Sequence, residues 1–188
     1  MVQQLEDERC LYKKQTIMRK LFLFFAFMVS LQSLLAQKPC SLPVFRQFDF
    51  WVGNWEAFAT NGKKAGDSKI SVMLDSCVIL EEWTSASAQQ GLTYSGKSFN
   101  MYNVATKQWQ QTWVDNTGNT TEFLRGTGSD GQIVYYADKV MDPQGKNFMR
   151  RLTFTKLTND KVRQFGERSD DEGKTWTAEY DLEYRRKK

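Results

Sequence analysis

The stretch FDFWVGNWE, residues 48–56, places Trp51 and Trp55 on either side of Gly53. Aromatic residues are enriched in β-strands, and a glycine inside such a run marks a bend or the close approach of another part of the chain. We therefore predict that this stretch contains the first strand of an aromatic-rich β-barrel, with Trp55 closing one end. A late arginine, Arg185 or Arg186, is expected to stack over the Trp55 ring as a cation–π lid.

The N-terminal segment has the pattern of a targeting sequence. Arg19 and Lys20 precede an almost wholly apolar run at 21–31 (LFLFFAFMVSL). This run is shorter than the roughly 20 apolar residues that span a bilayer. We predict an N-terminal extension and signal peptide at 1–36, with translation starting at Met18. An uncleaved anchor is the alternative.

Cleavage after residue 36 leaves 37–188, which we expect to form a single β-barrel domain with no stable membrane span. The protein is then exported and is periplasmic or extracellular. This part of the chain holds 21 basic and 19 acidic residues, a net charge of +2. The charges are dispersed, so the sequence favours no nucleic-acid partner.

The chain contains no histidine. Catalytic sites built on Ser-His-Asp or Cys-His are therefore excluded, and a zinc site on this chain would lack its usual nitrogen ligand. We predict no catalytic group, no metal site and no cofactor. An enzyme on this chain would have to move protons with carboxylates, Tyr, Lys or Arg.

Two cysteines, Cys40 and Cys77, remain after cleavage. Export permits disulfides, and two cysteines allow only one pairing. We expect a Cys40–Cys77 bridge that ties the segment before the first strand to the third strand. Two buried free thiols are the alternative.

Alternation of apolar and polar residues with period two runs through most of 51–185, which is typical of half-buried strands. Turn residues separate the runs, so the pattern predicts an antiparallel meander. We predict an all-β fold that closes into a calycin/lipocalin-like barrel of about 8–10 strands, with a two-sheet β-sandwich as the alternative. Only residues 42–48 resemble a helical turn. The predicted strands begin at 51 and continue at 69–74, 77–83, 96–103, 107–115, 119–127, 131–137, 147–156, 161–168 and 175–185.

Polar and aromatic side chains share one face of the runs 96–103 and 107–115. Buried amides and hydroxyls need hydrogen-bond partners, which a ligand or trapped water can supply. We predict that this face lines a ligand-binding cavity; the alternative has it facing solvent, with Phe99 and Met101 inside. The complete predicted set of ligand-binding residues is Trp83, Ser98, Asn100, Tyr102, Trp109, Gln111, Trp113, Arg151 and Gln164.

Glu81 shares a strand face with Ile79 and Trp83. A carboxyl group in such a place is buried, and burial raises its pKa. A salt bridge to Arg150 or Arg151 is the favoured expectation for the acidic residues of these strands. These candidate acids are Glu81, Glu82, Asp115, Glu122 and Glu167.

Several segments together resemble a family of uncharacterised secreted bacterial proteins, a lipocalin-like group whose chains begin with FDFWVGxW. The resemblance covers about residues 40–185. Asn54 stands where an acidic residue is common in that family, and Phe165 where Trp is common. The resemblance implies a calycin-like barrel in the cell envelope, and it implies no activity. The segments that carry it are FDFWVGNW (48–55), CVILEEW (77–83), GKSFNMY (96–102), WQQTWVD (109–115) and the Asp-box SDDEGKTW (169–176).

Three functions remain open. The first is an exported barrel that binds a small apolar or aromatic molecule, whose polar groups reach Asn100, Gln111 and Arg151. The second is an envelope protein-interaction module whose barrel is filled by its own side chains, with Trp83, Trp109 and Trp113 meeting at the centre. The third is a lyase- or isomerase-type enzyme that uses Tyr102, Arg151 and either Glu81 or Glu167. The sequence does not specify the oligomeric state.

Overall fold

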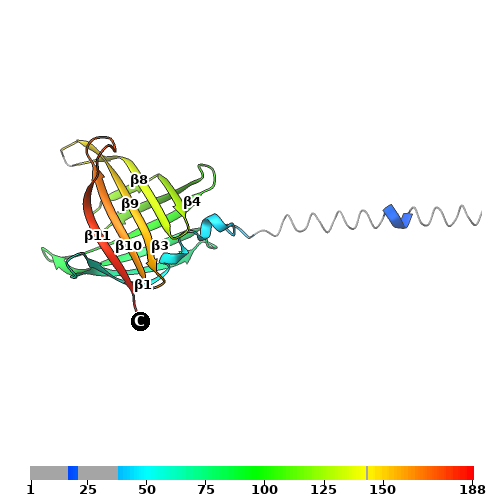
Figure 1. Ribbon diagram of the computed structural model, residues 1–188, viewed down its shortest axis with the longest axis horizontal. Helices are drawn as coiled ribbons and strands as arrows, with labels where there is room; N and C mark the ends of the chain where they lie inside the picture. The colour runs from blue at the N-terminus through cyan, green and yellow to red at the C-terminus, as the bar shows by residue number, and fades with distance from the viewer. Residues whose placement is uncertain (1–16, 21–37, 143) are drawn as a thin grey trace, which may run out of the picture. The chain divides into compact units, whose positions relative to one another are not determined.

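The computed structural model describes residues 17–20, 38–142 and 144–188. The predicted signal peptide therefore falls mostly outside the described residues. Residues 39–188 form one compact unit, a β-barrel (Figure 1). Two 3-10 turns, η1 (Pro43–Arg46) and η2 (Asp49–Trp51), precede eleven strands. The strands are β1 (Gly53–Ala59), β2 (Lys64–Met73), β3 (Val78–Gln89), β4 (Leu92–Asn103), β5 (Gln108–Asp115), β6 (Thr120–Phe123), β7 (Arg125–Ser129), β8 (Gln132–Met141), β9 (Asn147–Thr158), β10 (Lys161–Ser169) and β11 (Thr177–Arg186).

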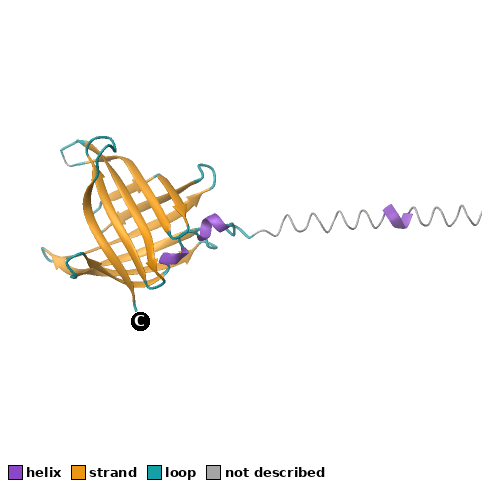
Figure 2. Ribbon diagram, in the orientation of Figure 1, coloured by secondary structure: helices purple, strands orange, loops and turns teal. Residues whose placement is uncertain are grey.

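All eleven strands belong to one antiparallel sheet, in the order β6-β5-β4-β3-β2-β1-β11-β10-β9-β8-β7. The sheet curls into a nearly closed barrel, so the predicted barrel is confirmed and the sandwich alternative is wrong (Figure 2). Its two edge strands, β6 and β7, are consecutive in the chain and separated only by Leu124. The predicted run 119–127 is this broken strand. Its first half pairs with β5 and its second half with β8, which gives eleven strands instead of ten.

Trp51 does not begin the first strand. It belongs to η2, and its ring stacks on Phe48 with centroids 5.0 Å apart and contacts Phe154 at 4.4 Å. All three side chains are completely buried, as is Trp55. The aromatic residues before β1 therefore fill one end of the barrel interior. Apolar residues from β8 and β10, such as Ile133 and Val162, complete this core.

The cation–π lid is confirmed, and it belongs to Arg186. Its guanidinium carbon lies 4.2 Å from the centre of the Trp55 ring, and its Nη1 donates to the Val52 carbonyl at 3.1 Å. Gly53 has φ +143°, and a Cβ at that position would collide with the guanidinium. Because β1 pairs with β11, this contact between Arg186 and Trp55 joins the first and the last strand of the barrel.

Arg186→Met keeps an apolar stem but removes the charge and its hydrogen bonds. We expect the free energy of unfolding to fall by about 1 kcal/mol, the usual size of a partly exposed cation–π contact. Urea unfolding followed by tryptophan fluorescence measures this change. Arg185→Met is the control, because Arg185 stacks on the outward-facing Phe58. Equal losses in the two variants would contradict the role of Arg186 as a lid.

The predicted disulfide is present between Cys40 and Cys77, with Cα atoms 5.1 Å apart. Cys77 lies in the turn between β2 and β3, one residue before β3 begins. The bond therefore anchors the segment that leads into η1 and η2 to this turn.

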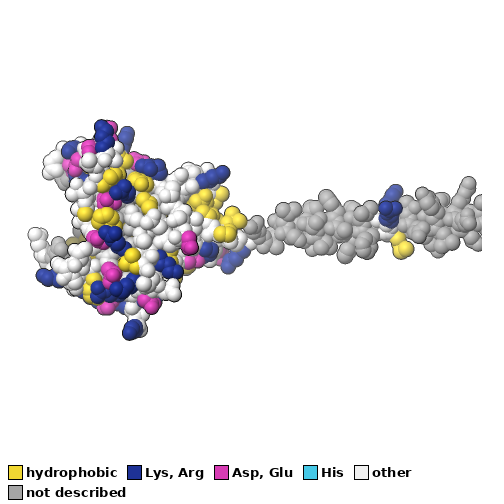
Figure 3. Space-filling view, in the orientation of Figure 1, with side chains coloured by type: hydrophobic (Ala, Val, Ile, Leu, Met, Phe, Trp, Pro, Cys, Tyr) yellow, Lys and Arg dark blue, Asp and Glu magenta, His cyan; other side chains and the backbone are white. Residues whose placement is uncertain are grey.

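Salt bridges between neighbouring strands cover much of the outer surface, for example Arg163–Asp181 at 2.7 Å and Lys97–Glu82 at 2.9 Å. Basic and acidic side chains are intermingled on the face of the barrel drawn in Figure 3. A nucleic-acid-binding surface requires basic residues gathered on one side. The charge pattern of this face is that of a solvated surface.

Candidate binding cavity

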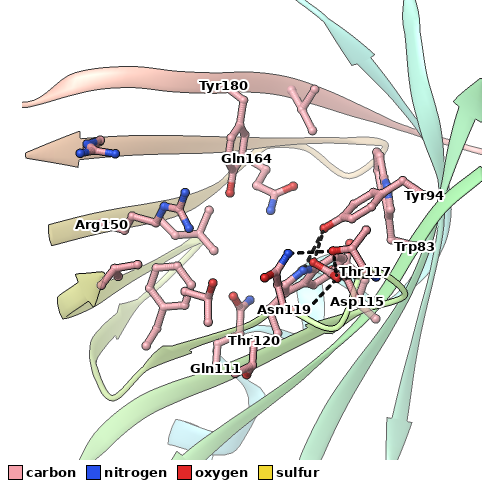
Figure 4. Close-up of a pocket in the computed structure, with 18 of the residues that line it drawn as sticks. Trp83, Tyr94, Gln111, Asp115, Thr117, Asn119, Thr120, Arg150, Gln164 and Tyr180 are labelled. Atoms are coloured by element: carbon pink, nitrogen blue, oxygen red, sulfur yellow. Dashed lines mark hydrogen bonds between the residues drawn. The ribbon is translucent and has the colours of Figure 1, made fainter. Parts of the chain in front are cut away.

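The barrel encloses a cavity of about 750 Å³ at the end where the β5–β6 and β8–β9 turns lie. Small-molecule sites typically have volumes of about 300–1,000 Å³. Tyr180 is 40% exposed, yet Figure 4 shows its ring pointing into this space. The apolar part of the wall consists mainly of Trp83, Tyr94, Trp113, Phe123, Val140, Phe148, Leu152, Tyr180 and Leu182.

A buried carboxyl group, that of Glu81 on β3, lies at the cavity wall and is only 2% exposed. The hydroxyls of Ser68 and Ser98 donate to its two oxygens, each at 2.9 Å. The phenol oxygen of Tyr184 lies 3.3 Å from Glu81 Oε1. These partners come from β2, β4 and β11, which bring them together because each presents this face to the interior.

Burial raises the pKa of Glu81 to about 7, against the opposing effect of hydrogen bonds from Ser68 and Ser98. The predicted raised pKa is therefore supported by the geometry of the site. The salt bridge expected from the candidate acids to Arg150 or Arg151 is formed by Glu167, which pairs with Arg151 at 2.7 Å, but not by Glu81. Among the described residues no Lys or Arg lies within ion-pair distance of Glu81, and both arginines pair with other carboxylates.

A chain of hydrogen bonds extends from Glu81 in two directions. On one side Asn100 donates to Ser98 Oγ at 2.9 Å, and Gln111 donates to Asn100 Oδ1 at 2.8 Å. On the other side Tyr184 donates to Gln164 Oε1 at 2.6 Å. Burial raises the pKa of Tyr184 well above its ordinary value, so its phenol keeps its proton.

The chain ends at Gln111 and Gln164, which both line the cavity and lie on opposite sides of it in Figure 4. Their side chains are 3% and 9% exposed. Within the described part of the chain, Gln111 Oε1 and Gln164 Nε2 have no hydrogen-bond partner. One free acceptor and one free donor therefore remain for a bound molecule or for water.

The mouth of the cavity carries a second carboxylate, Asp115, at the end of β5. Tyr94 donates to it at 3.0 Å, and Trp113 donates to the Tyr94 hydroxyl at 3.1 Å. Partial burial disfavours ionisation of Asp115, but hydrogen bonds from Thr117 and Asn119 outweigh it and lower the pKa of the carboxyl group. Asp115 is therefore ionised.

Two arginines stand on the opposite wall, and each is already bound to carboxylates. Arg150 donates twice to Glu179, at 2.9 and 3.2 Å. Arg168 lies 2.7 Å from Asp170 and 3.6 Å from Asp142. Both guanidinium groups also lie over the Phe148 ring, at 5.1 and 3.8 Å from its centre.

Four of the nine predicted ligand-binding residues line the cavity: Trp83, Gln111, Trp113 and Gln164. Ser98 and Asn100 lie just behind its wall, completely buried in the hydrogen-bond chain. Trp109 and Tyr102 lie in the filled end, where their rings contact Phe48 and Phe45. They shape the core and do not reach the cavity.

The prediction that Arg151 lines the interior is wrong. Arg151 lies on the outer face of β9, where it pairs with Glu167 at 2.7 Å and stacks over Trp176 at 4.5 Å. Its neighbours Arg150 and Leu152 line the cavity, and alternation along a strand sends Arg151 the opposite way. The proposed catalytic group of Tyr102, Arg151 and Glu81 or Glu167 is therefore not assembled.

Sequence reasoning missed Tyr94, Arg150, Arg168, Tyr180 and Tyr184 as cavity residues. A signal for Arg150 was present, because Phe148, Leu152 and Phe154 lie at even spacing from it and mark the inward face of β9. Tyr184 is marked in the same way by Leu182, two residues before it on β11.

Within the described residues no group of three His, Cys, Asp or Glu side chains is placed to hold a metal ion. In the same part of the chain no helix has the length and apolar character needed to cross a membrane. Comparison with known protein families gives no match, and a search of curated proteins finds none either.

Proposed function

We propose that the protein is exported and binds a small apolar or aromatic molecule inside its barrel. The observation that carries the proposal is the cavity of about 750 Å³, with aromatic walls and two free polar groups. Ligand sites typically combine apolar walls with a few placed polar groups in this way. The resemblance to secreted lipocalin-like proteins supports the same proposal.

Export is supported by the basic and apolar pattern at 19–31 and by the Cys40–Cys77 disulfide, since such bonds persist in oxidising compartments. The filled-barrel alternative required Trp83, Trp109 and Trp113 to meet at the centre. Trp109 lies in the filled end, whereas Trp83 and Trp113 stand on the cavity wall. This arrangement favours binding over a filled barrel.

N-phenyl-1-naphthylamine, an uncharged aromatic dye that fluoresces in apolar surroundings, tests the proposal. We expect one dye molecule per protein and energy transfer from Trp83 and Trp113. Thr121→Trp, which adds bulk at the cavity wall, should weaken dye binding at least about fivefold, because overpacking costs about 1–3 kcal/mol.

Thr153→Trp is the matched control, because Thr153 lies on β9 between the inward-facing Leu152 and Phe154 and therefore faces outward. It should leave dye affinity unchanged. Dye binding that is absent, or equally weakened in both variants, would contradict binding inside the cavity.

A further inference from the structure

Only some of the charged side chains at the cavity wall have a partner of opposite charge. Arg150 and Arg168 are both occupied by carboxylates, those of Glu179 and Asp170. Glu81 and Asp115, on the wall formed by β3, β4 and β5, have no cationic partner among the described residues. The unmatched charge inside the cavity is therefore negative.

Aromatic rings accompany both of these carboxyl groups. Trp83 lies two residues after Glu81 on the same strand face, and its ring centre is 6.2 Å from that of Tyr184, which contacts Glu81. Tyr94, which donates to Asp115, has its ring centre 6.3 Å from that of Trp113. The faces of such rings attract cations, most strongly where water is excluded.

The free polar atoms fit the same kind of ligand. Gln111 Oε1 is a free acceptor, and it belongs to a residue that is only 3% exposed. An ammonium group carries donors and no acceptor, so the Glu81 carboxylate can bind it, and Gln111 Oε1 can accept from a second donor on the same molecule. Gln164 Nε2 is left to donate to a neutral acceptor elsewhere on the same molecule.

We propose that the cavity takes an organic cation, a protonated amine on a flat apolar or aromatic body, with its ammonium group directed at Glu81. The inference rests on the binding function proposed above and names its ligand class. An anion would meet the unmatched carboxyl groups, and a neutral molecule would leave them unpaired.

Three indoles of nearly equal shape separate these ligand classes: tryptamine is a cation at pH 7, tryptophol is neutral and indole-3-acetate is an anion. Isothermal titration of the full chain with each measures their affinities. We expect tryptamine to bind at least about tenfold more tightly than the other two, because charge pairs in desolvated sites contribute that much or more.

Proton release provides a second measurement on the unaltered protein. With its pKa near 7, Glu81 is protonated in about half of the molecules at pH 7. A bound ammonium favours the ionised form, so tryptamine should release about half a proton per site, seen by titrating in buffers of different ionisation enthalpy.

The groups that face Glu81 do not obscure this signal. Ser68, Ser98 and Gln164 do not titrate near neutrality, and Tyr180 and Tyr184 keep their protons. The tryptamine ammonium group stays protonated below pH 8. Tryptamine affinity should therefore rise with pH toward 7 and level off above it.

Glu81→Gln should reduce tryptamine affinity at least about tenfold and abolish proton release, with little effect on tryptophol. Glu82→Gln is the matched control: Glu82 is the next residue on the outer face and pairs with Lys97. It should bind tryptamine as the unaltered protein does. If Glu81→Gln fails to fold, the proton release of the unaltered protein still decides the question.

Tryptophol or indole-3-acetate binding as tightly as tryptamine would overturn the cation inference and leave the binding function standing. Tryptamine binding without proton release at any pH between about 5 and 8 would also overturn it, because the ammonium group would then not reach Glu81. If none of the three indoles binds, the cation inference fails. The dye experiment with Thr121→Trp then decides separately whether the cavity binds anything.

Discussion

Glu81→Gln is expected to stabilise the protein at alkaline pH, although the variant alters the centre of a buried hydrogen-bond network. Burial raises the pKa of this carboxyl group from 4.5 to about 7. Each pKa unit corresponds to about 1.4 kcal/mol, so ionised Glu81 destabilises the folded state by about 3 kcal/mol. Glutamine has a similar shape and no charge to bury.

The direction of the pH dependence follows from proton binding. Between pH 4.5 and 7 the folded protein holds a proton on Glu81 that the unfolded chain has lost. Stability therefore falls as pH rises through this window, and the full penalty is present above pH 7. Below pH 4.5 both states are protonated, and the variant should match the unaltered protein.

Urea unfolding at pH 4 and at pH 8.5 measures this difference. Glu82→Gln again serves as the control, because the exposed Glu82 pairs with Lys97 and its pKa is lowered by that hydrogen bond. It should show no gain at pH 8.5. A Glu81→Gln variant that is less stable than the unaltered protein at pH 8.5 would contradict the raised pKa.

Trp51→Ala is expected to lower the free energy of unfolding by about 4 kcal/mol, the usual cost of removing a large buried aromatic side chain. The Trp51 ring contacts Phe48, Phe154 and Tyr184 and so joins η2 to β9 and β11. Its loss leaves a cavity that these rings fill only partly. Denaturant unfolding followed by circular dichroism measures the change.

Two further variants provide reference values for the loss of unfolding free energy in Trp51→Ala. Trp51→Phe should cost much less, because it keeps a ring in place and removes an indole N–H that has no partner among the described residues. Trp176→Ala removes a half-buried tryptophan outside the barrel, so we expect a loss of about 1 kcal/mol. A loss in Trp51→Ala no larger than that in Trp176→Ala would show that the filled end does not hold the barrel together.

The barrel was predictable from local pattern because its strands are short, alternate regularly and are joined by recognisable turns. The Arg186 lid followed from Gly53 and Trp55 together with a basic C-terminus. The break at Leu124 was not predicted, although the adjacent apolar residues Phe123 and Leu124 interrupt the alternation of 119–127 at that point. It arises where the sheet closes, when one segment has to pair with β5 and β8 in turn.

The cavity was harder to predict because alternation gives the face of a residue but not its depth in the barrel. Trp109 and Trp113 share one face of β5, yet Trp109 lies in the filled end and Trp113 lines the cavity. How far the filled end extends along the barrel depends on Phe48 and Trp51. Trp51 enters the barrel from η2, and Phe48 enters it from the position just before η2. Arg150 and Arg151 show the opposite case, since the apolar residues around them already indicated which one points inward.

A buried carboxyl group that destabilises the fold at neutral pH points to a use for its charge. Ser68, Ser98 and Tyr184 hold Glu81 at the wall of an otherwise largely aromatic cavity without neutralising it. The cost in stability and the capacity to bind a cation have the same physical origin. The alkaline stability of Glu81→Gln and its weak binding of tryptamine should therefore appear together.

Native mass spectrometry of residues 37–188, purified from a host that exports the protein, tests the binding function most directly. We predict a protein ion that carries one small molecule, which is lost on denaturation and is absent from Thr121→Trp but present in Thr153→Trp. The mass of that molecule would begin to identify it. The contradicting result is a bare protein mass in all three proteins, lowered only by the two daltons that the Cys40–Cys77 bond removes. In that case adding tryptamine or the dye would also leave the mass unchanged.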